Sequence, residues 1–375
     1  MFRLSNLLSS VVEGKKARVL DGSIAIWNFT NRCNLSCMHC YSKADLDAVD
    51  TLTTEDIFKT LDKFKENGVK FLIFSGGEPL TRKDIYDIAA RCKELGIITY
   101  LSTNGLYVGK NNAQKLVDTF NYIGISIDGS EKTHDHFRGL EGSFKESMKA
   151  VKLLNSFKGS KVGIRFTVTK ETYDDLQFIF ELAEKENIPK IYISHLVYSG
   201  RGLENLEMDL TKEQRREAVL YILDKAFEYH QSGRDIEIVT GNMEQDAILF
   251  LEKFAKKYPN LKQEMKNRLI SWGGNSAGRK LLNIDSEGNV KPDPFFPKII
   301  GNILKEDFSD IWTKEPTELL EKLRIHPREI SGKCKDCDYL NICNGGSRSR
   351  AYAIYGDMWA EDPSCYLTEK EIKEN

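Results

Sequence analysis

Three cysteines near the start of the chain are spaced for metal binding. Cys33, Cys37 and Cys40 form a C-x3-C-x2-C pattern shortly after a predicted strand over 23–29. Three thiolates are one too few for a closed four-ligand site, so an iron–sulfur cubane bound here would keep one iron open for another ligand. The same thiolates together with His39 would also suit a tetrahedral zinc ion. Spacing alone leaves both interpretations open.

A second group of cysteines near the other end supplies a complete ligand set. Its members are Cys334, Cys337, Cys343 and Cys365. Four thiolates close a site without any external ligand, as structural zinc or an iron–sulfur cluster requires. Clustered cysteines of this kind are more typical of metal binding in a reducing compartment than of disulfides. The eighth cysteine, Cys92, stands alone in a predicted helix and is expected to be a small buried residue.

Further candidates lie where predicted strands end. Ser75-Gly76-Gly77-Glu78-Pro79 closes the second strand, Asn104 follows the third, and Ser126 and Asp128 close the fourth. The two glycines allow a backbone to pass close to a ligand, although Asn-Gly and Asp-Gly pairs are also ordinary turn signals. Arg165 is charged within an apolar fifth strand. An inward Arg there requires an anion, whereas an outward Arg would be solvated.

Strands and helices alternate along the first half of the chain. The predicted strands span 23–29, 71–75, 97–102, 122–128, 162–168 and 190–196. Between them, one helix over 54–67 begins after Thr53 and stops at Gly68, and another over 83–95 stops at Gly96. Six such units predict an α/β fold with a parallel sheet. Both an open sheet and a partial barrel place ligand chemistry at the carboxyl ends of the strands.

The pattern changes after about residue 210. Helices predicted over 212–231 and 243–257 flank one strand over 236–239, and Gly and Pro become frequent from 273 to 297. The remainder has little regular pattern, as expected for a small domain organised by metal. At the other end, leucines and valines between Leu4 and Val12 recur at helical spacing, which predicts an amphipathic helix docked on the body.

Composition excludes several classes of protein. The 375 residues are 41% hydrophobic, so a large core is expected. Their net charge is −2 and they show no basic patch of the kind that would indicate nucleic-acid binding. No apolar stretch approaches the ~20 residues of a membrane span. A cytoplasmic protein is expected.

The first cysteine pattern, followed one strand later by Ser-Gly-Gly-Glu-Pro, resembles the radical S-adenosylmethionine (SAM) superfamily. The resemblance implies a partial (β/α)6 barrel over 23–210 and a [4Fe–4S] cluster whose open iron chelates the methionine part of SAM. It assigns the segment Gly76, Gly77, Glu78 and Pro79 to the methionine amino group. It implies that Asn104, Ser126 and Asp128 contact the ligand and that Arg165 binds a carboxylate. His134 and Arg138 also match the family and are expected to be structural hydrogen-bonding residues.

The second cysteine group resembles the SPASM or twitch auxiliary domains of radical enzymes. This resemblance implies a second, auxiliary [4Fe–4S] cluster in a domain over 271–375, with zinc as the alternative metal. The segment 282–294, where a two-cluster domain carries further cysteines, has none here. The predicted organisation is therefore an N-terminal helix over 1–22, the core, a helical connector over 211–270 and the auxiliary domain.

The run from Asn344 to Tyr352 and the ending from Asp362 to Tyr366 resemble radical enzymes of haem and haem d1 formation. The implied reaction removes acetate side chains from didecarboxysirohaem to give Fe-coproporphyrin III by 5′-deoxyadenosyl radical chemistry. Removal of propionates from the same substrate, modification of a peptide, and a non-enzymatic metal scaffold are the alternatives. Implied partners are a modified tetrapyrrole and an electron donor such as a ferredoxin or flavodoxin. Arg348 and Arg350 are expected to bind substrate carboxylates or, alternatively, to hydrogen-bond their own loop.

Overall fold

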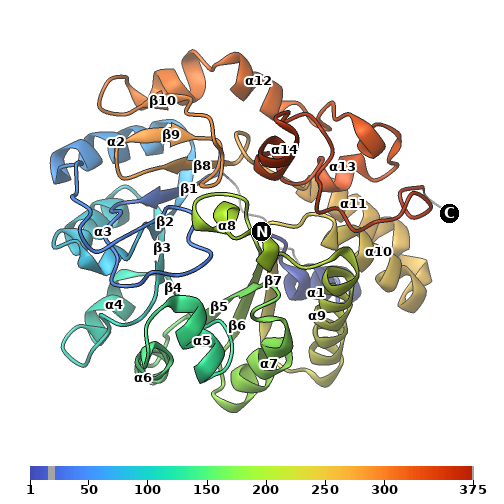
Figure 1. Ribbon diagram of the computed structural model, residues 1–375, viewed down its shortest axis with the longest axis horizontal. Helices are drawn as coiled ribbons and strands as arrows, with labels where there is room; N and C mark the ends of the chain where they lie inside the picture. Colours follow the sequence, from blue (N-terminus) through green and yellow to red (C-terminus); the bar gives the residue numbers. More distant parts are fainter. Residues whose placement is uncertain (16–21, 374–375) are drawn as a thin grey trace.

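A single curved sheet forms the centre of the molecule. The computed structural model describes residues 1–15 and 22–373, and the sheet order is β10-β9-β8-β1-β2-β3-β4-β5-β6-β7 (Figure 1). The strands are β1 (Ser23–Asn28), β2 (Val69–Ser75), β3 (Ile98–Thr103), β4 (Tyr122–Ser126), β5 (Val162–Val168), β6 (Lys190–His195), β7 (Glu237–Gly241), β8 (Leu281–Ile284), β9 (Asn289–Lys291) and β10 (Gly301–Asn302).

Strands β1 to β7 are parallel and follow one another in chain order across the sheet. The curved sheet leaves a partial barrel, and helices cover its outer face (Figure 1). The predicted α/β fold with a partial barrel of radical SAM type is thus confirmed, and the strand predicted over 236–239 joins the same sheet as β7. All carboxyl ends of these strands lie at one edge, where side chains from distant segments converge.

Helices fill the connections. They are α1 (Leu4–Val12), α2 (Thr54–Glu66), α3 (Ile85–Glu94), α4 (Ala113–Thr119), α5 (Glu131–Arg138), α6 (Ser143–Asn155), α7 (Leu176–Lys185), α8 (Arg201–Glu204), α9 (Lys212–Ser232), α10 (Asp246–Lys257), α11 (Lys262–Trp272), α12 (Glu318–Arg324), α13 (Leu340–Cys343) and α14 (Arg348–Tyr355). Thr53 caps α2 as predicted, in a reciprocal capping box with Asp56.

Strand alternation divides the side chains between the barrel interior and the helices. On β6, Tyr192 and Ser194 face the interior, whereas Ile191 and Ile193 are fully buried in the main hydrophobic core. β1 shows the same division, with Ile24 and Ile26 facing the interior. The barrel interior therefore carries polar groups at its mouth while the helix-facing side stays apolar.

The N-terminal helix packs on the body as expected. Leu4 and Leu8 of α1 are completely buried, and the Phe2 amide donates to the Thr240 carbonyl at 2.7 Å, which joins the segment to β7. The predicted N-terminal segment over 1–22 also includes residues 16–21, which lie outside the described residues. Within the described part of the chain, no helix combines the length and apolarity needed to cross a membrane.

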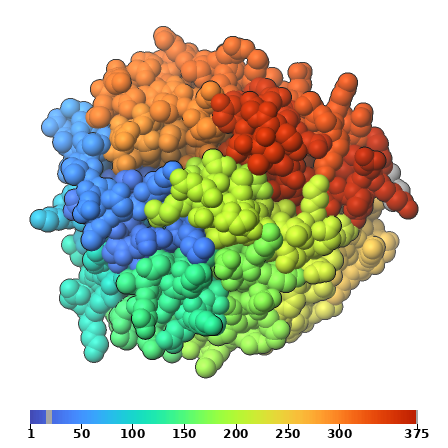
Figure 2. All heavy atoms as spheres, in the orientation of Figure 1, coloured from blue at the N-terminus to red at the C-terminus, as the bar shows by residue number. Residues whose placement is uncertain are grey.

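The C-terminal segment begins inside the core sheet. β8 pairs in parallel with β1, Ile24 opposite Leu281, although it follows the predicted boundary at 271. From β9 onward the chain folds over one side of the barrel mouth, and its residues form a surface continuous with the core (Figure 2). The predicted division into four segments stays a prediction. The core sheet includes β8, which lies beyond the boundary predicted at 271.

Candidate functional site

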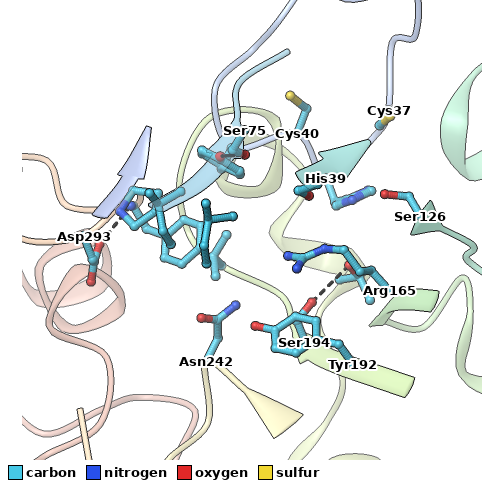
Figure 3. A pocket seen from close by; sticks show the side chains of 18 of the residues that line it. Cys37, His39, Cys40, Ser75, Ser126, Arg165, Tyr192, Ser194, Asn242 and Asp293 are labelled. Carbon is cyan, nitrogen blue, oxygen red and sulfur yellow. Dashed lines mark hydrogen bonds between the residues drawn. The ribbon is translucent and has the colours of Figure 1, made fainter. Parts of the chain in front are cut away.

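A cavity of about 250 Å³ opens at the mouth of the barrel. Its lining comes from the carboxyl ends of the parallel strands and from the loops that follow them (Figure 3). The predicted site residues that line it are Cys33, Cys37, Cys40, Gly76, Gly77, Asn104, Ser126 and Arg165. The sequence therefore identified one wall of a real cavity.

The three N-terminal cysteines share this wall and form no disulfide. Burial raises the pKa of Cys33 to about 12 and also raises the pKa of Cys37. The Arg138 guanidinium donates to Cys37 Sγ at 3.5 Å, so positive charge already faces the thiol group. Deprotonated thiols in such a buried place require compensating charge, as a bound iron–sulfur cluster would provide.

In the described ranges, no three Cys, His, Asp or Glu side chains converge as the ligands of one metal ion do. His39, the proposed fourth zinc ligand, instead stacks its ring on Phe137 with centroids 4.4 Å apart. Cysteines that bind different irons of a cluster do not need to converge on one point.

Arg201 on the short helix α8 holds the cysteine loop in place. Its backbone amide donates to the Cys40 carbonyl at 2.8 Å, and its guanidinium donates to the Cys37 carbonyl at 2.7 Å. Helix α8 lies in front of the barrel opening in Figure 1. Sequence reasoning missed this residue, because it follows β6 and lies far from the cysteines along the chain.

The glycine pair fits tightly against the loop that leads to Cys33. Gly76 has φ of 138°, and a Cβ at Gly77 would lie 2.3 Å from the Arg32 carbonyl oxygen. The Gly77 amide donates to the Thr30 carbonyl at 2.8 Å. Glycine is required here because two backbones touch, which leaves the Gly76–Gly77 edge facing the cavity.

Glu78 differs from its expected role. Its carboxylate accepts hydrogen bonds from the Asn104 amide at 2.7 Å and from Thr103 Oγ1 at 2.8 Å, and it is absent from the cavity lining. Burial raises the pKa of Glu78 to about 7. The side chain ties the end of β2 to the end of β3. Pro79 begins the short 3-10 turn that follows and is buried as well.

The Asp128 side chain also bonds within the fold and does not line the cavity. It is completely buried, forms an ion pair with Arg138, and accepts from the Thr167 amide at 2.7 Å. His134 Nδ1 accepts from the Asp128 amide at 3.0 Å, and burial lowers the pKa of His134 to about 3, so the ring is neutral. His134 and Arg138 are the structural hydrogen-bonding residues that the sequence predicts.

Ser126 and Arg165 remain available at the cavity, whereas the Asn104 side chain also lines it but already donates to Asn34 Oδ1 at 2.8 Å and accepts from the Leu106 amide at 2.9 Å. Figure 3 shows the Arg165 guanidinium pointing into it, and the group lies 4.5 Å from the Tyr192 ring. No described residue forms a salt bridge with this guanidinium, so it can receive an anionic ligand. The expected role of Arg165 in binding a carboxylate stays a prediction that this placement allows.

The wall opposite the cysteines was not predicted. It includes Asn242 after β7, which points into the cavity in Figure 3, and two further lining residues, Asp293 after β9 and Glu244. Asn242 directly follows the end of a strand, as Asn104 does, yet the predicted core ended at residue 210. No comparable signal in the sequence indicates Asp293.

The four C-terminal cysteines form no disulfide either. Burial raises the pKa of Cys343 well above its usual range, and the other three thiols add to the shift through their negative charges. These four groups, three of them buried and Cys337 half-buried, are in mutual electrostatic contact and suit an iron–sulfur cluster that needs no outside ligand. The group is separate from the cavity, whose lining includes none of these four cysteines.

Arg348 and Arg350 differ from the expected substrate contacts. Both are almost completely buried and absent from the cavity lining. Arg350 pairs with Asp362 at 2.8 Å, and Arg348 donates to the Met358 carbonyl at 2.7 Å. These bonds correspond to the alternative interpretation, in which the arginines hold their own loop.

Comparisons with known proteins agree with this architecture. Residues 27–183 match the radical SAM superfamily, and residues 276–338 match an iron–sulfur cluster-binding domain. Pre-heme d1 synthase of Dinoroseobacter shibae is 38% identical over 99% of this chain and 93% of its own length. Fe-coproporphyrin III synthase of Methanosarcina barkeri is 38% identical over 93% of this chain and 89% of its own.

A solved structure shows the same fold. Streptococcus suis SuiB bound to S-adenosylmethionine aligns over 92% of this chain and 78% of its own, with a TM-score of 0.72 and 20% identity. The two matched families give the cofactors, which are S-adenosylmethionine and iron–sulfur clusters. Together, the barrel, the cysteine-lined cavity and the relatives identify the chain as a member of the radical SAM superfamily, of the kind that carries a C-terminal iron–sulfur domain.

Proposed function

We propose that this enzyme removes acetate side chains from didecarboxysirohaem to give Fe-coproporphyrin III. The carrying observation is a cavity with three unpaired cysteines on one wall, in a chain 38% identical to an Fe-coproporphyrin III synthase. In this proposal, Cys33, Cys37 and Cys40 hold the cluster that leaves one iron open. Cys334, Cys337, Cys343 and Cys365 hold the auxiliary cluster.

Residues of this chain orient the cofactor. S-adenosylmethionine bound at the open iron supplies the 5′-deoxyadenosyl radical. The Gly76–Gly77 edge lies against the cysteine loop and faces the cavity, where it can accept the methionine amino group. Arg165 supplies the cation for the methionine carboxylate, and Asn104 and Ser126 supply polar groups for the ribose. Held by these residues, S-adenosylmethionine would supply its radical within reach of a bound substrate.

Removal of propionates is the second candidate. The pre-heme d1 synthase of Dinoroseobacter shibae has the same identity, 38%, and spans 99% of this chain. A PqqA peptide cyclase of Granulibacter bethesdensis is only 25% identical, which favours a tetrapyrrole over a peptide substrate. The proposal also includes a ferredoxin or flavodoxin as electron donor and a cytoplasmic location.

Anaerobic turnover tests the proposal directly. The reconstituted enzyme is mixed with didecarboxysirohaem, S-adenosylmethionine and a reductant, and the product mass is read. Acetate and propionate removal differ by one methylene per lost side chain, so the mass separates the two candidates. Formation of 5′-deoxyadenosine with an unchanged tetrapyrrole would refute the proposed substrate.

A further inference from the structure

The Arg165 guanidinium lacks an acidic partner because carboxylates in this part of the barrel are paired elsewhere. Arg165 lies on β5, is half-buried and lines the cavity, and it forms no salt bridge with a described residue. Asp128 pairs with Arg138. Glu237 pairs with Lys190 at 3.2 Å. The guanidinium therefore keeps its charge and its hydrogen-bond donors for an anion that enters the cavity.

The ring of Tyr192 contacts this guanidinium through its face. Arg165 and Tyr192 occupy paired positions on the neighbouring strands β5 and β6. The guanidinium carbon lies 4.5 Å from the centre of the ring, and Figure 3 shows both side chains at the cavity. A cation over an aromatic face is attracted to the π electrons, more strongly where water is excluded. This contact restricts where a guanidinium without an ion pair can lie.

Two glycines on other strands leave the space that this arrangement occupies. A Cβ at Gly124 on β4 would lie 2.9 Å from Arg165 Cδ, and a Cβ at Gly241 on β7 would lie 2.1 Å from Tyr192 Oη. Neither glycine has a positive φ, so the backbone conformation does not require glycine at these positions. What requires it is the close approach of the two side chains, because a methyl group would displace the arginine or the ring.

We propose that Tyr192 is a positioning residue that holds the Arg165 guanidinium over its ring and directs it at a carboxylate in the cavity, with Gly124 and Gly241 leaving room for the pair. The inference rests on the proposed function, in which Arg165 receives the methionine carboxylate of S-adenosylmethionine. A side-chain carboxylate of the tetrapyrrole has the same chemistry, so the experiment separates the two sources. A guanidinium that is already in place loses little freedom on binding, and affinity falls when the ring is removed.

Binding of S-adenosylmethionine to the anaerobically reconstituted enzyme measures the effect of the ring. The dissociation constant is determined by equilibrium dialysis without a reductant, so that the ligand is not cleaved. Tyr192→Leu removes the aromatic face and should weaken binding about three- to thirtyfold. Tyr192→Phe keeps the face and should restore the affinity of the wild type.

Two comparisons show whether Tyr192 acts through Arg165. Arg165→Gln should itself weaken binding, and Tyr192→Leu added to it should weaken binding little further, because the group that the ring positions is gone. Decarboxylated S-adenosylmethionine lacks the carboxylate, so Tyr192→Leu should leave its affinity unchanged. Equal losses for both ligands, or additive losses in the double variant, would make Tyr192 merely structural and overturn the proposal.

Gly124→Ala tests the arrangement with the ring in place. The added Cβ meets the flexible stem of Arg165, which can give way without a backbone shift, so the guanidinium moves and affinity should fall. The matched control is Tyr221→Leu on α9, whose ring packs on Phe180 with centroids 5.6 Å apart and does not line the cavity. It should bind as the wild type does, and melting temperatures show whether each variant folds.

Absorption titration of the same variants with Fe-coproporphyrin III identifies the carboxylate. A loss confined to S-adenosylmethionine assigns Arg165 to the methionine carboxylate, and a loss confined to the tetrapyrrole assigns it to a substrate side chain. Unchanged affinity for both ligands in folded Tyr192→Leu and Gly124→Ala enzymes would overturn the role of Tyr192. A wild-type enzyme that binds no tetrapyrrole would refute the proposed substrate, whereas the S-adenosylmethionine titrations would still decide the role of Tyr192.

Discussion

Replacing Gly77 by Ala should damage the SAM site through one atom. The added Cβ would lie 2.3 Å from the Arg32 carbonyl oxygen, about 1 Å closer than ordinary van der Waals contact. The obstacle is backbone, and Arg32 directly precedes Cys33, so relief requires the cysteine loop or the glycine edge to move by about that distance. A misplacement of about 1 Å near reacting groups costs roughly 100-fold in rate.

The assay is formation of 5′-deoxyadenosine by the reduced, reconstituted enzyme, with iron content measured on the same sample. G96A is the matched control. A Cβ at Gly96 meets nothing within 4 Å, although its φ of 75° imposes a backbone cost of about 1–2 kcal/mol. G96A should therefore lose stability but retain its rate. A G77A enzyme that forms 5′-deoxyadenosine within twofold of wild type would show that the close approach of these backbones is not needed for the chemistry.

Two further substitutions test the roles given to the cysteines and the buried arginines. Changing Cys33, Cys37 and Cys40 together to Ala should abolish 5′-deoxyadenosine formation but leave the iron of the auxiliary group, because the two cysteine groups are separate. Iron analysis and the product assay check this, and full activity in the triple variant would contradict it. Arg350→Ala should lower the free energy of unfolding by about 3–5 kcal/mol, since it leaves Asp362 buried and unpaired, and an unchanged midpoint in chemical denaturation would mean that the pair is not structural.

Local signals in the sequence predicted much of the fold. Thr53 caps α2, and Gly68 and Gly96 adopt the left-handed conformation expected after a helix, because residue type alone determines these features. The strands carry alternating or continuous apolar residues that indicate their position. The fourth was predicted to reach Asp128 but ends at Ser126.

The candidate site was harder to predict, because a polar residue at a strand end can turn toward the cavity or toward a buried partner. Asp128 and Glu78 accept hydrogen bonds from groups within the fold, whereas Ser126 and Arg165 face the cavity. Arg350 has the positive charge that would bind a substrate carboxylate, but it forms an ion pair with Asp362 of the same chain. The partner of each side chain is supplied by a distant part of the chain, so no local sequence pattern predicts it.

The pairing of β1 with β8 also affects how this chain is made. β1 is among the first strands to leave the ribosome, but β8, which covers its second side, follows only after every other barrel strand. Until then β1 presents a free row of amides and carbonyls beside an apolar sequence, a template for pairing with another chain. Synthesis that stops before Leu281 leaves this edge open, so truncated products should aggregate even though they contain the whole cysteine-lined wall of the cavity.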